Sequence, residues 1–185
     1  MKQQLQEIND EYLKVEMYLN LSSEQVLHLS EEELNATQDK REEAIDVYRV
    51  VVERFVEIAP SLLPSEVIEA YEQAGQTLKA HLAGHMYQHF NEVYIPLMVE
   101  AINNDDSEGL YLFLNALSQS LNKEQLLPIV LKALDGKFQR TRRTALEIIQ
   151  VLSLKQALPK IKLMVSDDNP GVAKLAQEIV LLFEK

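Results

Sequence analysis

Three histidines, His81, His85 and His89, recur at intervals of four residues in the middle of the chain. On a helix this spacing aligns the imidazoles along one face, where neighbours one turn apart can share a Zn, Cu or Ni ion. Glu92 lies one turn beyond the row and Glu72 lies upstream, so a carboxylate from another helix could complete a metal site. The row lacks the His-Glu-x-x-His order of zinc proteases. The other interpretations are histidines that flank the core, or a polar groove that contacts a partner.

A second cluster of potentially functional residues is Arg140, Arg142 and Arg143. Three arginines at a helix start suit a small anion or the phosphates of a nucleic acid. The alternative is that Arg142 bonds an acidic turn of a neighbouring helical hairpin. The strong negative charge of the rest of the chain favours this second interpretation.

The acidic residues form the third group of candidates. Residues 1–110 contain 22 acidic and 7 basic side chains, whereas residues 111–185 contain 7 acidic and 11 basic ones, within a net charge of −11. An acidic field repels nucleic acid and attracts cationic proteins, although many acidic chains gain only solubility from it. The candidate partner-binding residues are Glu31, Glu32, Glu33, Glu42, Glu43, Glu69 and Glu72, together with His81, His85 and His89.

The elements that must position these residues are helices. Apolar residues at three- and four-residue spacing predict a helix over 5–19 and long helical stretches over 30–59 and 64–94, with a break at Gly75. A capping signal at Ser22 adds a short helix through Leu29. The apolar stripe expected on the 30–59 helix comprises Leu34, Ile45, Tyr48, Val51, Val52, Phe55 and Ile58. A second expected stripe comprises Leu82, Met86, Phe90 and Val93.

The last third of the chain contains an internal repeat. Leu127–Pro128 recurs as Leu158–Pro159, 31 residues later, and in this register Ala145 falls on Ala176. A fixed period of this length is typical of stacked helical hairpins. Because proline costs least in the first turn of a helix, Pro128 and Pro159 are both predicted near helix starts.

The residues of this repeat resemble the HEAT repeat of the short bacterial type. The resemblance rests on the stretches 153–161, with Ala157-Leu158-Pro159, and 165–172, with an Asp-rich turn, and it is clearest over residues 122–183. Arg142 occupies the position of the family's arginine, whereas Ala173 does not, which suggests that the last unit is a cap. The resemblance implies an α–α superhelix of the HEAT/ARM kind, a solenoid that binds other proteins.

Composition excludes several kinds of protein. Cysteine is absent, so disulfides and thiolate chemistry are excluded. No apolar run is long enough for a membrane span, and the first residues lack a leader pattern, which together favour a cytoplasmic location. The sequence contains no glycine-rich phosphate loop and no nucleophile motif. The expectation is therefore a protein that is not an enzyme and has no cofactor.

The sequence thus predicts an all-α fold, an α–α superhelix with an irregular N-terminal part. Residues 1–91 form an acidic helical part, in the same domain as two to three HEAT-like repeats over 92–185. The leading functional hypothesis is protein binding, in its sharper form an acidic inhibitor or immunity-type protein that blocks a basic partner such as a toxin nuclease. The alternatives are a metal-binding protein using His81, His85 and His89, and a nucleic-acid-binding repeat using the arginines.

Overall fold

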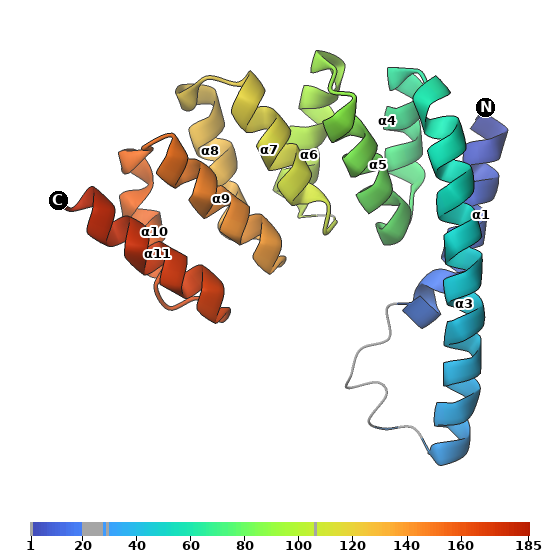
Figure 1. The fold of residues 1–185 in the computed structure, drawn as a ribbon. Coiled ribbons are helices and arrows are strands. Elements are labelled where there is room, and N and C mark those ends of the chain that lie inside the picture. The colour runs from blue at the N-terminus through green and yellow to red at the C-terminus, as the bar shows by residue number, and fades with distance from the viewer. Residues whose placement is uncertain (1, 20–27, 29, 106) are drawn as a thin grey trace. The chain divides into compact units, whose positions relative to one another are not determined.

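The computed structural model describes residues 2–19, 28, 30–105 and 107–185. Within these residues every regular element is a helix, which confirms the all-α prediction (Figure 1). Contacts between residues divide the chain into two compact units, residues 1–82 and 83–185. This division falls inside one helix, whereas the sequence suggested a change of character between residues 91 and 92. The short helix expected from Ser22 to Leu29 lies outside the described residues.

The first unit is built around an antiparallel pair of helices, α1 (Lys2–Leu19) and α3 (Glu31–Ile58). Arg54, near the end of α3, binds Glu7 and Glu11 in the first half and the middle of α1. A turn of 3-10 helix (Ala59–Ser61) then leads to α4 (Pro64–Gln73), which packs on α1. The break predicted at Gly75 is confirmed, because α5 (Gln76–Gln88) begins directly after it.

The apolar stripe predicted on α3 is partly wrong. Leu34 and Ile45 are exposed, whereas Ala44, Val51 and Phe55 face the core. These three residues are separated by seven and four positions, so they lie on one side of the helix. The packing of α3 is centred on that side, and Leu34 and Ile45 lie at its margin.

The second unit consists of three consecutive pairs of helices. They are α6 (Ile95–Asn104) with α7 (Leu110–Ser120), α8 (Lys123–Ala133) with α9 (Gln139–Val151), and α10 (Leu158–Met164) with α11 (Pro170–Phe183). Helix α9 packs against both α7 and α11, and α6 packs against α8, so successive pairs stack in two layers. In Figure 1, α7, α9 and α11 lie in front of the other layer.

The sequence register of 31 residues agrees with this packing. Ala145 and Ala176, which it matches, are both fully buried, and so are Ile149 and Val130 in the middle pair. A small residue at the matched position lets the two helices of a pair approach closely. Each pair still leaves an apolar side that only its neighbour covers, which is why the pairs stack.

The predicted helix start at Pro128 is wrong. Pro159 does lie in the first turn of α10, but Pro128 lies inside α8, five residues after its first residue. The reason is the N-cap at Asn122, whose side chain accepts hydrogen bonds from Glu124 N and Gln125 N, both at 3.0 Å. The side chain of Gln125 in turn accepts from Asn122 N, which completes a capping box. In α10 the matching residues, Lys155–Ala157, form a separate 3-10 turn instead.

The stripe predicted to continue from Met86 to Phe90 and Val93 is also wrong. Helix α5 ends at Gln88, so its periodicity does not extend to these two residues. Leu82 and Met86 are fully buried, whereas 36% of Phe90 and 51% of Val93 are exposed. A turn of 3-10 helix, Glu92–Tyr94, follows and places Tyr94 in the core instead.

Candidate interaction surfaces

Helix α3 positions most of the acidic candidates. Its N-terminus is fixed by a capping box: Ser30 Oγ accepts from Glu33 N at 3.3 Å, and Ser30 N donates to the Glu33 carboxylate at 2.9 Å. Hydrogen bonds from the Ser30 hydroxyl and backbone lower the pKa of Glu33, so its carboxylate serves the helix start. Glu32, Glu42 and Glu43 are exposed on the same helix. The side chain of Glu31 lies outside the described part.

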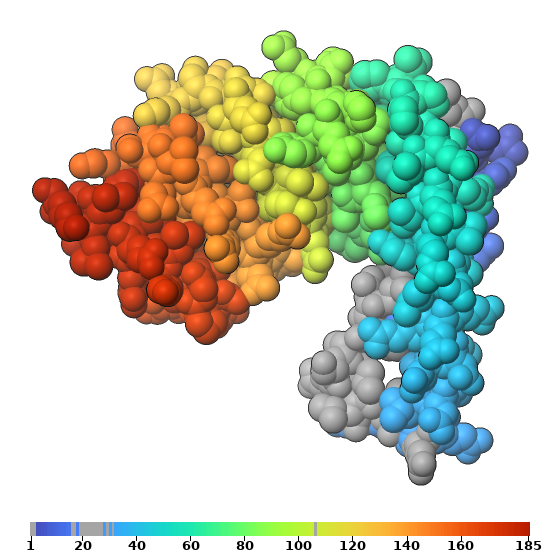
Figure 2. Space-filling model, viewed as in Figure 1, coloured from blue at the N-terminus to red at the C-terminus, as the bar shows by residue number. Residues whose placement is uncertain are grey.

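The exposed side of α3 carries more carboxylates than the sequence analysis selected. Six exposed acidic residues are separated by seven, three, four, seven and four positions, so they lie on one side of the helix. The span covers about 38 Å at 1.5 Å per residue. In Figure 2 the cyan surface of α3 lies at the front of the view. We call this set the α3 acidic face: Glu32, Asp39, Glu42, Asp46, Glu53 and Glu57.

An apolar row lies beside the α3 acidic face. Leu34, Ile45 and Val56 recur every eleven residues, three helical turns apart, and are 39%, 42% and 62% exposed. Within the first unit, α3 therefore presents carboxylates next to accessible apolar side chains. The heptad-like spacing of the acids was present in the sequence, but only the packing of α1 on the opposite side shows that it faces outward.

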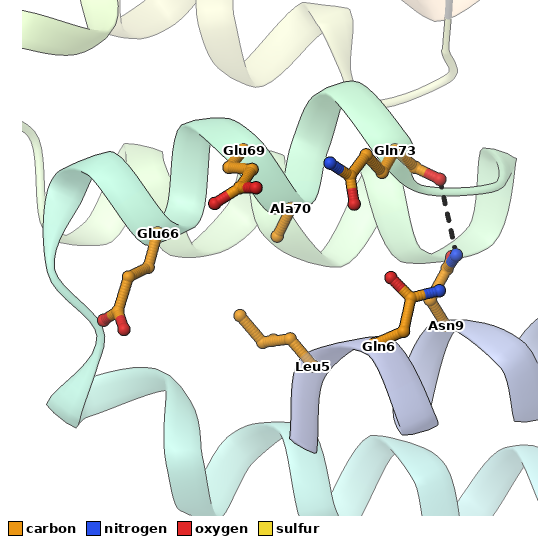
Figure 3. A pocket seen from close by; sticks show the side chains of 7 residues that line it. All are labelled: Leu5, Gln6, Asn9, Glu66, Glu69, Ala70 and Gln73. Atoms are coloured by element: carbon orange, nitrogen blue, oxygen red, sulfur yellow. Dashed lines mark hydrogen bonds between the residues drawn. The ribbon is translucent and has the colours of Figure 1, made fainter. Parts of the chain in front are cut away.

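Glu69 and Glu72 lie on α4, away from the α3 acidic face. Glu69 lines a small crevice between α1 and α4, together with Glu66, Gln73 and Asn9 (Figure 3). The crevice has a volume of about 30 Å³, which is room for roughly one or two water molecules and not for a ligand. Glu66 is occupied locally, since its carboxylate accepts from Leu63 N at 2.9 Å. Glu72 is exposed.

The predicted histidine row divides between different environments. His81 belongs to the first unit, where its Nε2 lies 3.0 Å from the hydroxyl of Tyr48 and its ring stacks on Tyr12 at 5.9 Å. His85 is buried in the second unit, with its ring centroid 4.7 Å from that of His89, which lies beyond the end of α5. In the described part of the chain, no three potential ligands come together for a metal ion.

Burial makes His81 sensitive to pH. It lowers the pKa of His81 below 6.5, because the imidazolium is poorly solvated among Tyr12, Tyr48 and Phe55. As the pH falls, the unfolded chain therefore binds the proton first. The stability that depends on neutral His81 is complete above about pH 6.5 and is lost as the pH falls through the lower, folded pKa.

We expect the NMR titration of the His81 ring Cε1–H to have a midpoint below 6.5. The free energy of unfolding should also fall between pH 7 and about pH 5.5, and the fall should be smaller in His81→Phe. Burial and the charge of His89 also lower the pKa of His85. His85 therefore still contributes to the loss of unfolding free energy in His81→Phe. A midpoint at or above 6.5 would contradict the assignment.

The three arginines have three different environments. Arg142 is buried and donates through Nε and Nη2 to the Asp167 carboxylate, both at 2.9 Å, and through Nη2 to Asp168 at 2.5 Å. Its Nη1 donates to the carbonyls of Gly136 and Lys137, both at 3.0 Å. This confirms the prediction that Arg142 bonds the acidic turn of the neighbouring hairpin, so it is not available to an external anion.

Arg142 and Asp167 each stabilise the charged form of the other. The hydrogen bonds that Arg142 donates to the Asp167 carboxylate hold the pKa of Arg142 above its usual range, against the cost of burial. Burial alone would raise the pKa of Asp167, but hydrogen bonds from Arg142 and from Asn169 N keep it low. One step earlier in the stack, Asp105 accepts from Lys137 N at 2.7 Å. Thus Asp105, at the end of α6, bonds the turn of the second pair, and Arg142, in the first turn of α9, bonds the turn of the third pair.

Arg143 and Arg140 lie on the surface. Arg143 donates to Glu147 one turn later, at 2.9 Å. The guanidinium of Arg140 stacks on Tyr111 of α7, 3.8 Å from the ring centre. Both arginines line a groove of about 680 Å³ between α7, α9 and α11, which sequence reasoning did not detect because its walls come from three separate segments. The groove is lined by Tyr111, Asn115, Gln139, Arg140, Arg143, Thr144, Glu147, Asn169 and Val172.

Over the described residues, no helix combines the length and the apolar character needed to cross a membrane. Comparison with protein-family models, with curated protein sequences and with solved structures gives no significant match. What the protein does is therefore inferred from its own surfaces.

Proposed function

We propose that the protein is a non-enzymatic binding module whose α3 acidic face docks a cationic protein. The observation that carries the proposal is the exposed row of six carboxylates beside Leu34, Ile45 and Val56. Carboxylates steer a basic partner during encounter, and adjacent apolar side chains supply area that is removed from water on contact. A face that served only solubility would not need accessible apolar side chains beside its carboxylates. The combination therefore favours a surface that contacts another protein.

We further propose that the second unit belongs to a HEAT-like α-solenoid. The stacking of three helix pairs in two layers supports this, and so does the bonding of Arg142 to the next acidic turn. Scaffolds of this kind hold binding surfaces rigidly while each pair contacts only its neighbours. In the sharper form of the proposal, the protein is an acidic inhibitor of the immunity type, which covers the basic surface of a partner such as a toxin nuclease.

The test begins with the partner recovered from the native host on the tagged full-length chain at low salt. Its association rate is then measured by stopped flow at increasing ionic strength. We expect the rate to fall steeply with salt, since screening shortens the range of the α3 field. The variant Glu42→Lys/Glu53→Lys should slow association by about tenfold or more. The matched control Glu100→Lys/Glu178→Lys reverses the same number of exposed charges in the second unit and should have a much smaller effect.

Two outcomes would reject the proposal. A rate that does not respond to ionic strength would remove electrostatic docking. Equal losses in the two double variants would show that net charge matters and that the α3 acidic face does not. Substituting Ile45 and Val56 by serine tests the apolar row separately and should raise the dissociation rate rather than slow association.

A further inference from the structure

The groove between α7, α9 and α11 has the size of a binding site and an unusual lining. Its volume of about 680 Å³ lies within the range of about 300–1,000 Å³ that ligand sites occupy. Most of its lining is polar, and it contains two arginines but one carboxylate, Glu147. In an acidic protein this is a local surface of the opposite sign, within the second unit.

Arg140 is the residue in this groove whose chemistry is left unused. Its guanidinium plane is held on the Tyr111 ring, and no acceptor for its N–H groups is found among the described residues. Arg143 differs because it is paired with Glu147, and Arg142 differs because two carboxylates and two carbonyls satisfy it. Stacking restricts the rotamers of Arg140 in advance, so less entropy is lost when its N–H groups bind a planar anion.

The rest of the lining favours a polypeptide over a nucleic acid. One free arginine neutralises too few phosphates to hold a nucleic-acid backbone, whereas it is sufficient for a single carboxylate of a peptide. The amide of Asn115 can donate to and accept from a peptide backbone, and the Gln139 amide keeps its donors because only its oxygen is engaged, by Asn169. Val151 lies on the same side of α9, eleven residues after Arg140, and is 79% exposed. It offers an apolar contact about 16 Å along the helix.

We propose that this groove binds an extended acidic segment of another protein, with Arg140 taking an Asp or Glu carboxylate in a two-bond fork. The site is separate from the α3 acidic face and takes a ligand of opposite charge. If the groove binds no acidic segment, the proposed docking of a cationic protein on the α3 acidic face still stands. If that docking is rejected, the proposal for the groove still stands.

The probe is a phage-displayed library of random peptides of about twelve residues, roughly 40 Å when extended, selected on the full-length protein. Enriched peptides are synthesised, and their Kd values are measured by fluorescence anisotropy. We expect an acidic residue at a fixed position in the enriched set. The Arg140→Gln variant should weaken binding by about tenfold or more, since the carboxylate loses both charge-assisted hydrogen bonds of the fork. The control Lys132→Gln removes an exposed charge from α8 and should leave the Kd unchanged.

A double-mutant cycle makes the assignment specific. Replacing the fixed acidic residue of the peptide by its amide should raise the Kd for the native protein by the same factor as Arg140→Gln does. The same replacement should leave the Kd for the Arg140→Gln variant unchanged. Tyr111→Leu should also weaken binding, because it frees the guanidinium. Selection that enriches no acidic position, additive losses in the cycle, or Arg140-dependent binding of an oligothymidine instead of peptides would overturn the proposal.

Discussion

Replacing Arg142 by alanine should cost the second unit about 3–5 kcal/mol of unfolding free energy, the range measured when one partner of a buried ion pair is removed. The side chains of Arg142 and Asp167 are only 10% and 6% exposed, so water cannot solvate the carboxylate left behind. The variant also leaves the Gly136 and Lys137 carbonyls without their donor. Asp168 contributes little to this loss, because its side chain is 86% exposed.

Urea denaturation of the full-length chain, followed by circular dichroism, measures this loss. The neighbouring variant Arg143→Ala is the control: it breaks an exposed pair one turn apart and should cost no more than about 0.5 kcal/mol. Adding Asp167→Asn to Arg142→Ala removes the unpaired charge and should recover part of the stability. Equal effects of the two alanine substitutions would show that the bonding between turns does not stabilise the stack.

Replacing Asn9 by leucine should destabilise the first unit by about 1–3 kcal/mol, the cost of leaving partly buried backbone groups unpaired. Asn9 is 6% exposed, and its amide spans the break between α4 and α5. Its Nδ2 donates to the Gln73 carbonyl at 3.3 Å, as the dashed line in Figure 3 shows, and its Oδ1 accepts from Gly75 N at 3.1 Å. Leucine has a similar volume but can satisfy neither group.

The measurement is again the free energy of unfolding, together with amide hydrogen exchange at residues 73–76. Exchange of Gly75 N–H should become faster in Asn9→Leu, because its acceptor is gone. Gln6→Ala changes an exposed residue of the same crevice, whose amide donates to Asp10 on its own helix. Its loss should stay within about 0.5 kcal/mol. A Gly75 exchange rate unchanged by Asn9→Leu would exclude Asn9 as the brace of this break.

Local signals in the sequence determined the helices and several of their ends. The break at Gly75 depends on residues a few positions apart, so it can be predicted without knowing the fold. The pairing of Arg142 with an acidic turn was also predictable, because the repeat places the two in adjacent hairpins.

Only the tertiary structure decided which member of each cluster is available at the surface. Arg140, Arg142 and Arg143 form one cluster in the sequence. In the structure, Arg142 is buried against Asp167, Arg143 is paired with Glu147 on the surface, and Arg140 stacks on Tyr111 of another helix. His81 and His89 belong to the same row at four-residue intervals. However, His81 is enclosed by aromatic rings, whereas His89 lies beyond the end of α5. The α3 acidic face follows from the packing of α1 on the opposite side. Residue type and spacing determine the side of a helix on which a group lies, whereas contacts between distant segments determine whether that side is covered.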